Sequence, residues 1–202
     1  MTSPRFVGGD GGADRRITGA LLILGFVLLF GGIIMFSASV GRPVAPMYLQ
    51  LERSFVISAV VLAALGFVLL EDVLQQAGDR VLSRLGATAF LFGMVLIVVA
   101  EAHGLGNPTV DDPFELILHR IYVALASASE AVFGASILRT KIVSGWVGWT
   151  TILWNVGVLI GLPVFNVLAG DPGYYYPVLQ FVMPLVIGIA LLSRPPPGAI
   201  PE

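Results

Sequence analysis

Stretches of about 20 mostly apolar residues recur along this 202-residue chain, and they leave few folds open to it. A membrane-spanning helix needs about 20 such residues, because it rises about 1.5 Å per residue through a hydrocarbon layer roughly 30 Å thick. Six windows meet this requirement: residues 17–38, 54–73, 82–103, 114–138, 145–165 and 175–192. Glycine, proline and polar residues mark the junctions between them. We therefore predict an all-α integral membrane protein, a six-helix transmembrane bundle.

The composition supports this class and excludes others. Hydrophobic residues make up 56% of the chain, charged residues 12%, and the mean hydropathy is +0.91. A soluble domain carries about 25% charged residues. A formal net charge of −2 gives no basic surface for nucleic acid, and the lack of cysteine excludes disulfides and thiolate metal sites. The lipid bilayer is therefore the expected partner, and other membrane subunits or a second copy of the chain are compatible with the composition.

The distribution of basic residues predicts an orientation. If the N-terminus is cytoplasmic, most basic residues fall on the cytoplasmic side: Arg5, Arg15, Arg16, Arg80, Arg84, Arg139, Lys141 and Arg194. The external side then holds Arg42, Arg53 and Arg120. Cytoplasmic loops are enriched in Lys and Arg. We predict a multi-pass protein of the cell membrane with both termini cytoplasmic, a flexible tail at 1–16, a transmembrane domain at 17–193 and a short tail at 194–202.

Charged residues gather in the stretch AEAHGLGNPTVDDPFELILHRIY, residues 100–122, which this topology places outside. The external cluster comprises Glu101, His103, Asp111, Asp112, Glu115, His119 and Arg120. Glu115 and His119 are four residues apart on one helical face, so they can share a metal ion with His103 and an aspartate, and these donors suit zinc or copper. The alternative is a solvated loop with a structural Glu101–Arg120 ion pair. The loose spacing favours the second interpretation and leaves any metal or cofactor unknown.

A second polar group lies deep within the apolar windows. One stripe of window 114–138 carries Glu115, His119, Tyr122, Ala126 and Glu130. Glu130, Asn155 and Gln180 each lie near the middle of a window, and we call them the intramembrane polar cluster. An ionised carboxylate at this depth costs at least about 2.5 kcal/mol. We therefore expect Glu130 to face the interior and to bond with Asn155, Trp154 or Gln180, either as a link between helices or as a proton relay.

Three functions are compatible with these features. The sequence contains no G-x-x-x-x-G-K-[ST] or H-E-x-x-H motif, which argues against an enzyme. The weak motifs favour a non-catalytic accessory or packing subunit of a larger membrane complex. A small proton-coupled transporter that uses the intramembrane polar cluster is the first alternative, and a metal-binding protein or enzyme that uses the external cluster is the second. Gly157 and Gly161 form a G-x-x-x-G pattern, which predicts close helix packing.

Overall fold

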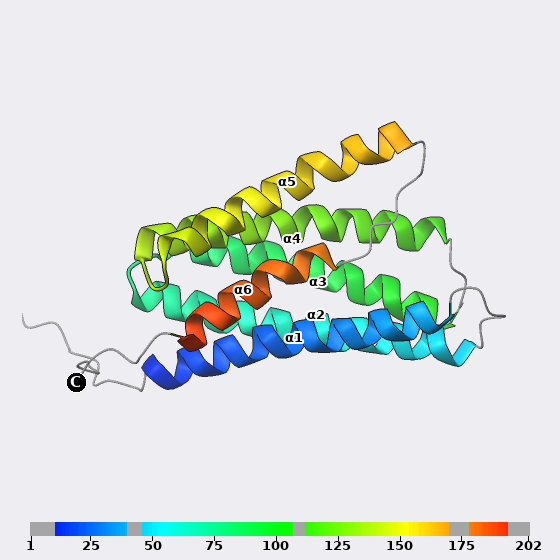
Figure 1. Cartoon of the computed structure of the whole chain (residues 1–202), viewed down its shortest axis with the longest axis horizontal. Coiled ribbons are helices and arrows are strands. Elements are labelled where there is room, and N and C mark those ends of the chain that lie inside the picture. The colour runs from blue at the N-terminus through cyan, green and yellow to red at the C-terminus, as the bar shows by residue number, and fades with distance from the viewer. Residues whose placement is uncertain (1–10, 40–45, 107–111, 170–177, 194–202) are drawn as a thin grey trace, which may run out of the picture.

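A computed structural model describes residues 11–39, 46–106, 112–169 and 178–193, and every regular element in these ranges is an α-helix. The helices are α1 (Gly11–Ser39), α2 (Pro46–Gln76), α3 (Val81–Gly106), α4 (Pro113–Thr140), α5 (Gly145–Ala169) and α6 (Leu179–Ser193) (Figure 1). The prediction of an all-α fold with six helices is confirmed. The first helix begins at Gly11 rather than at residue 17.

The lengths of the helices decide which of them could cross a membrane. Four of them contain segments long and apolar enough to cross a membrane: Gly12–Ser37, Met47–Gln76, Val81–Gly106 and Pro113–Thr140. They indicate a membrane-embedded protein. The 15 residues of α6 rise about 22 Å, which is less than the roughly 30 Å of a hydrocarbon core. The count of six spans and the cytoplasmic location of the termini stay predictions.

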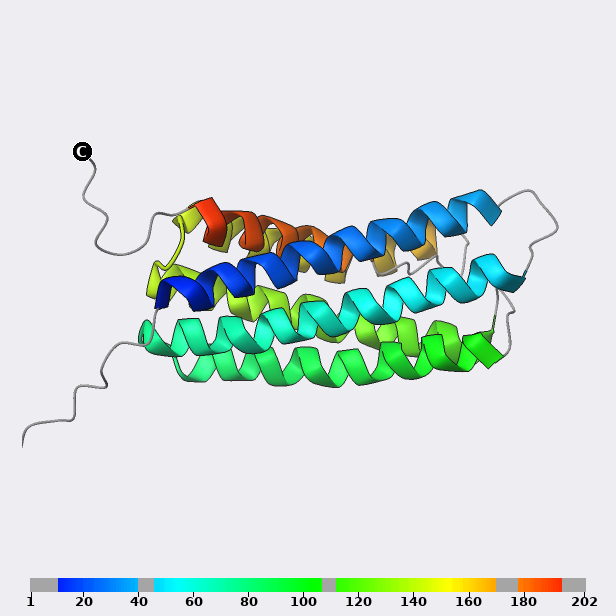
Figure 2. The ribbon, with the colours of Figure 1, turned by 90° about the horizontal axis from the view of Figure 1, so that it is seen from below.

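The helices form an elongated bundle in which neighbours along the chain run antiparallel (Figures 1 and 2). α2, α3 and α4 form the centre, α1 packs along α2, α5 packs on α4, and α6 lies against α1. Gly19 of α1 and Gly188 of α6 face each other so closely that a Cβ on either would lie 2.8 Å from the carbonyl oxygen of the other. The start of α1 and the end of α6 therefore share one end of the bundle, the terminal end. The opposite end is called the distal end.

Local sequence determines where α4 begins and ends. Asp112 is its N-cap, and the Asp112 side chain accepts a hydrogen bond from the backbone N–H of Phe114. Pro113 follows in the first turn, where its missing N–H has no partner to lose. At the other end Lys141 adopts the left-handed conformation with φ of 55°, and its N–H donates to the carbonyl of Ile137.

The burial pattern of α4 places this helix inside the bundle. Phe133 stacks on Phe67 of α2 at 4.8 Å between ring centroids, and Phe67 lies 4.4 Å from the ring of Phe90 on α3. Ile117 and Ile121 point outward and are exposed, as suits a lipid-facing side. The predicted stripe faces inward: Glu115, Tyr122, Ala126 and Glu130 are buried and His119 is half-buried. Its polar groups therefore lie among the other helices.

Candidate functional site

Four ionisable side chains from three helices meet near the distal end, and we call them the distal ion network. Arg53 Nη1 of α2 lies 2.9 Å from Glu115 Oε2 of α4 and 3.5 Å from Glu101 Oε2 of α3. Glu101 Oε1 lies 2.8 Å from Nε2 of His119 on α4. Arg53, Glu101 and Glu115 are only 6%, 4% and 5% exposed. The network therefore joins α2, α3 and α4 through charges that are removed from solvent.

Arg53 is absent from the site residues predicted from the sequence, because it stands just before the apolar window 54–73. α2 begins at Pro46, so Arg53 lies about two turns inside the helix. Gly104 of α3 provides the space for its guanidinium, since a Cβ at Gly104 would overlap Nη1. The sequence did contain a reason to expect a cation here. Two buried acids on neighbouring helices of a membrane protein need a positively charged partner, because burying unpaired carboxylates is costly.

The predicted Glu101–Arg120 pair is wrong. The two carboxylate oxygens of Glu101 contact Arg53 and His119, whereas Arg120 is exposed. Arg120 directly follows His119 and is turned about 100° around α4, so the two cannot both face α3. His119 pairs with Glu101, and Glu115 pairs with Arg53. Asp111, another member of the external cluster, lies outside the described residues.

His103 and Asp112 form a separate pair beside the distal ion network. His103 Nε2 lies 3.0 Å from Asp112 Oδ2, and the His103 ring meets the Phe114 ring edge-on at 5.2 Å. Asp112 Oδ1 accepts the N–H of Phe114 at 2.8 Å. The backbone N–H of Phe114, followed by the His103 side chain, holds the pKa of Asp112 below its usual range, because both favour the carboxylate. This pair connects the end of α3 to the start of α4 at the distal end of the bundle.

A second polar group lies near the middle of the bundle. It contains the intramembrane polar cluster together with Tyr122 and Ser127, and we call this set the extended intramembrane polar cluster. Asn155 Nδ2 of α5 donates to Glu130 Oε2 at 3.1 Å and to the carbonyl of Thr151 at 2.9 Å. The predicted interior position of Glu130 and its bond to Asn155 are confirmed. Gln180 of α6 donates instead to Ser127 Oγ, at 3.4 Å. All three C-terminal helices thus bring polar side chains to one region of the bundle.

The extended intramembrane polar cluster has unused hydrogen-bonding capacity. Within the described part of the chain, buried oxygens without a hydrogen-bond partner include Glu130 Oε1, Asn155 Oδ1, Gln180 Oε1 and the Tyr122 hydroxyl. Tyr122, Glu130 and Asn155 are fully buried, and Gln180 is 1% exposed. A buried polar atom without a partner costs about 1–3 kcal/mol. The cluster is therefore not a closed set of hydrogen bonds, and it can accept a further polar group or proton.

We expect Glu130→Leu to lower the free energy of unfolding by about 1–3 kcal/mol, because the Asn155 amide loses a buried partner. Glu130→Gln keeps an acceptor for Asn155 and should unfold near the wild-type temperature. Thermal unfolding in detergent measures both variants. Equal midpoints for the leucine variant and the wild type would show that the Glu130–Asn155 bond does not support the fold.

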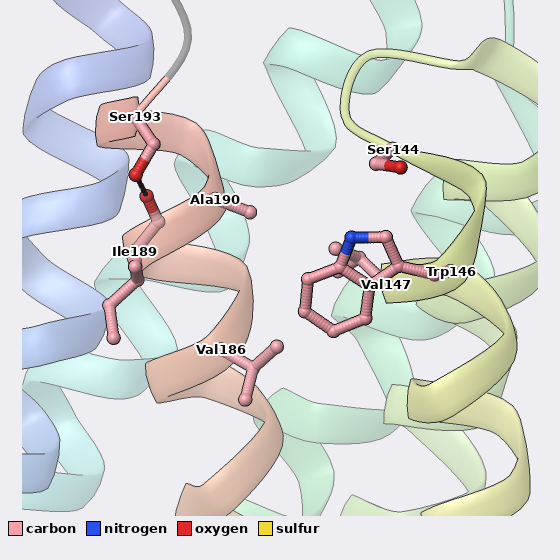
Figure 3. Close-up of a pocket in the computed structure, with 7 residues that line it drawn as sticks. All are labelled: Ser144, Trp146, Val147, Val186, Ile189, Ala190 and Ser193. Carbon is pink, nitrogen blue, oxygen red and sulfur yellow. Dashed lines mark hydrogen bonds between the residues drawn. The ribbon is translucent and has the colours of Figure 1, made fainter.

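The structure also contains a pocket of about 330 Å³ between the start of α5 and the end of α6 (Figure 3). Trp146, Val147, Val186, Ile189 and Ala190 line it with apolar groups, with Ser144 and Ser193 at its edge. The Ser193 hydroxyl donates a hydrogen bond to the carbonyl oxygen of Ile189 at 2.7 Å. Among the described residues that line this pocket, none is charged. The described part of the lining is therefore apolar apart from the two serines.

Comparisons of the chain with protein-family models, with curated proteins and with solved structures find no match. The function has to be inferred from the two polar regions and from the helices that hold them.

Proposed function

We propose that the protein is a small proton-coupled membrane carrier in which Glu130 takes up and releases the proton. One observation carries the proposal: Glu130 is fully buried near mid-depth, one of its oxygens bonds to Asn155, and the other has no partner among the described residues. A carboxyl group that only linked two helices would be expected to use both oxygens. Acidic residues inside a membrane bundle mark ion or proton pathways.

The interior face of α4 supports a pathway to Glu130. Starting at the distal end, this face carries Glu115, His119, Tyr122, Ser127 and Glu130, none of which is exposed. Glu130 lies about 26 Å along the axis from the first residue of α4, because the two are 17 residues apart at about 1.5 Å each. Groups that donate and accept protons therefore recur along the route from the distal end to mid-depth.

The geometry of α6 also supports a carrier. Gln180, the second residue of α6, bonds to Ser127 in the middle of α4, so α6 begins at mid-depth and runs to the terminal end. Figure 1 shows its first turn at the middle of the bundle. Pro184 interrupts the hydrogen bonding of its first turns. In transporters, half-helices whose N-termini lie inside the membrane point their free N–H groups at the substrate site, and the N-terminus of α6 has a similar place in the bundle.

The proposal predicts proton movement that depends on Glu130. The full chain is reconstituted into liposomes with an entrapped pH dye, an inward proton gradient is imposed, and small polar solutes are supplied in turn on either side. We expect the wild type to acidify the lumen with at least one solute, and Glu130→Gln to abolish this flux while keeping the fold. Glu71→Gln is the matched control, since Glu71 bonds within α2 to Gln75, near the terminal end.

Two outcomes would contradict the carrier. The first is a Glu130→Gln variant that retains the wild-type flux, because the proton would then not pass through this carboxyl. The second is a wild-type flux equal to that of empty liposomes with every solute tested. That result would favour the accessory subunit, for which extraction in mild detergent should recover a stable complex with another membrane protein.

A further inference from the structure

Three potential metal ligands meet where α3 ends and α4 begins. His103 lies in the last turn of α3, Asp112 caps α4, and Glu115 lies in the first turn of α4. One ligand atom of each residue lies within 4.8 Å of the others, and His103 Nε2 and Asp112 Oδ2 are 3.0 Å apart. Donors at about 2.1 Å from a tetrahedral zinc ion stand roughly 3.4 Å apart. A shift of about an ångström in the Glu115 side chain would therefore bring all three within reach of one ion.

Glu115 provides a second and independent observation. Its side chain is buried, its Oε2 is held by Arg53 at 2.9 Å, and its Oε1 has no hydrogen-bond partner in the described part of the chain. A buried carboxylate oxygen normally has a partner. The oxygen belongs to a carboxylate that already lies beside an imidazole and a second carboxylate. A cation is the partner that this arrangement accommodates.

In each of the two carboxylates, one oxygen is held by a neighbouring group that orients the side chain. Asp112 Oδ1 accepts the N–H of Phe114, which leaves Oδ2 facing His103. Arg53 fixes Glu115 through one oxygen and leaves the second available. Hydrogen bonds that orient ligands in this way are typical of metal sites in proteins. The backbone and Arg53 thus leave Glu115 Oε1 without a partner in the described part of the chain, and they leave Asp112 Oδ2 bonded to His103 Nε2, a contact that a bound ion would replace.

The charge balance also favours a divalent cation. Asp112, Glu115 and the adjacent Glu101 bring three negative charges, and Arg53 offsets one of them. A divalent ion would offset the remaining negative charge of the carboxylates. The side chains of His103 and Asp112 are 37% and 21% exposed, so an ion can enter from the aqueous side.

We propose that His103, Asp112 and Glu115 form a site for a divalent transition-metal ion of the zinc class at the distal end of the bundle. An imidazole with two carboxylates suits zinc and related ions better than magnesium or calcium, which prefer oxygen ligands alone. Three protein ligands leave a fourth position for water or another donor. Glu115 lies about 22 Å along the axis of α4 from Glu130, and zinc binding is measured in the absence of any proton flux.

Zinc binding to the purified full chain tests the site. After treatment with a chelator and its removal, the protein is titrated with Zn²⁺ by calorimetry, and the bound metal is counted by elemental analysis. We expect one ion per chain and a higher unfolding temperature with zinc. His103→Ala should weaken zinc binding at least about tenfold. Loss of a residue that only orients a metal ligand already costs about 10- to 100-fold in affinity, and loss of a ligand should cost no less. His103 is partly exposed, so this variant should still fold.

His119→Ala is the matched control, because His119 is the other histidine of the chain and pairs with Glu101 outside the three ligands. It should keep one zinc ion per chain. Asp112→Asn retains an N-cap for α4 and should lower zinc affinity while the helix is preserved. No zinc binding by the wild type would overturn the proposal. Equal affinities of the wild type and the His103→Ala variant, or a loss caused by His119→Ala instead, would overturn it as well.

Discussion

Arg53→Met should lower the free energy of unfolding by about 3–5 kcal/mol, because it leaves two buried carboxylates without their guanidinium. Glu101 and Glu115 lie on different helices, and both are almost inaccessible to water. Methionine keeps most of the apolar volume of the arginine stem, so the loss reports mainly the charge. Thermal and chemical unfolding in detergent should show the change as an earlier transition.

Two further variants isolate the cause of this loss. Arg120→Met removes the exposed guanidinium that lies eight residues after Asp112, the N-cap of α4. This variant should change the free energy of unfolding by less than about 1 kcal/mol. Arg53→Met combined with Glu115→Gln should recover part of the loss, since fewer charges then remain unpaired. If Arg120→Met were as damaging as Arg53→Met, or if the double variant were less stable than Arg53→Met alone, the distal ion network would not have the role assigned to it.

Gly134→Val should be strongly damaging, because this glycine lies where α4 and α5 approach each other closely through Gly134 and Gly148. A Cβ at Gly134 would lie 2.8 Å from the carbonyl oxygen of Gly148 and 2.9 Å from Cγ1 of Ile152. The first of these atoms belongs to the backbone of α5, so the whole helix has to move. Forcing extra atoms into a packed interface costs about 1–3 kcal/mol and sometimes more. The expected result is a lower unfolding temperature and easier proteolysis of α5.

Gly157→Val on α5 is the matched control. A Cβ at Gly157 or at Gly161 would meet nothing within 4 Å, so the close packing predicted from their G-x-x-x-G pattern is wrong within the described residues. Both substitutions exchange glycine for valine inside a helix, and their difference therefore measures the contact between helices. Equal unfolding temperatures for the two variants would contradict the close approach of α4 and α5 at Gly134.

The two polar regions differ in what holds them. The distal ion network is held by contacts among one guanidinium, two carboxylates and an imidazole, whereas the extended intramembrane polar cluster relies on amides and hydroxyls, several of whose oxygens have no partner in the described part of the chain. Unpaired polar atoms at mid-depth are costly, and such sites in membrane bundles take part in function. This difference is the reason for proposing that the proton binds at Glu130 and that the metal ion binds at the ligands beside the distal ion network.

The sequence by itself determined the features that depend on local periodicity and on length. Apolar windows of about 20 residues predicted helices in a membrane, because backbone groups in lipid have to be satisfied within the helix. The 3.6-residue period predicted that Glu115, Tyr122 and Glu130 share the buried face of α4. Glu130 and Asn155 each lie near the middle of an apolar window, which predicted that they could meet, and the two are bonded.

Only the tertiary structure decided which charges meet across helices. Arg53 pairs with acids 48 and 62 residues away, at Glu101 and Glu115, and this choice depends on how far each helix is rotated about its axis. That rotation is set by packing, for example by Gly104, whose missing side chain admits the guanidinium. Local periodicity assigns a residue to a face of its own helix but does not determine which neighbour covers that face. For this reason the sequence could not distinguish Arg120 from Arg53 as the partner of Glu101. The packing of α2 against α3 brings Arg53 to Glu101.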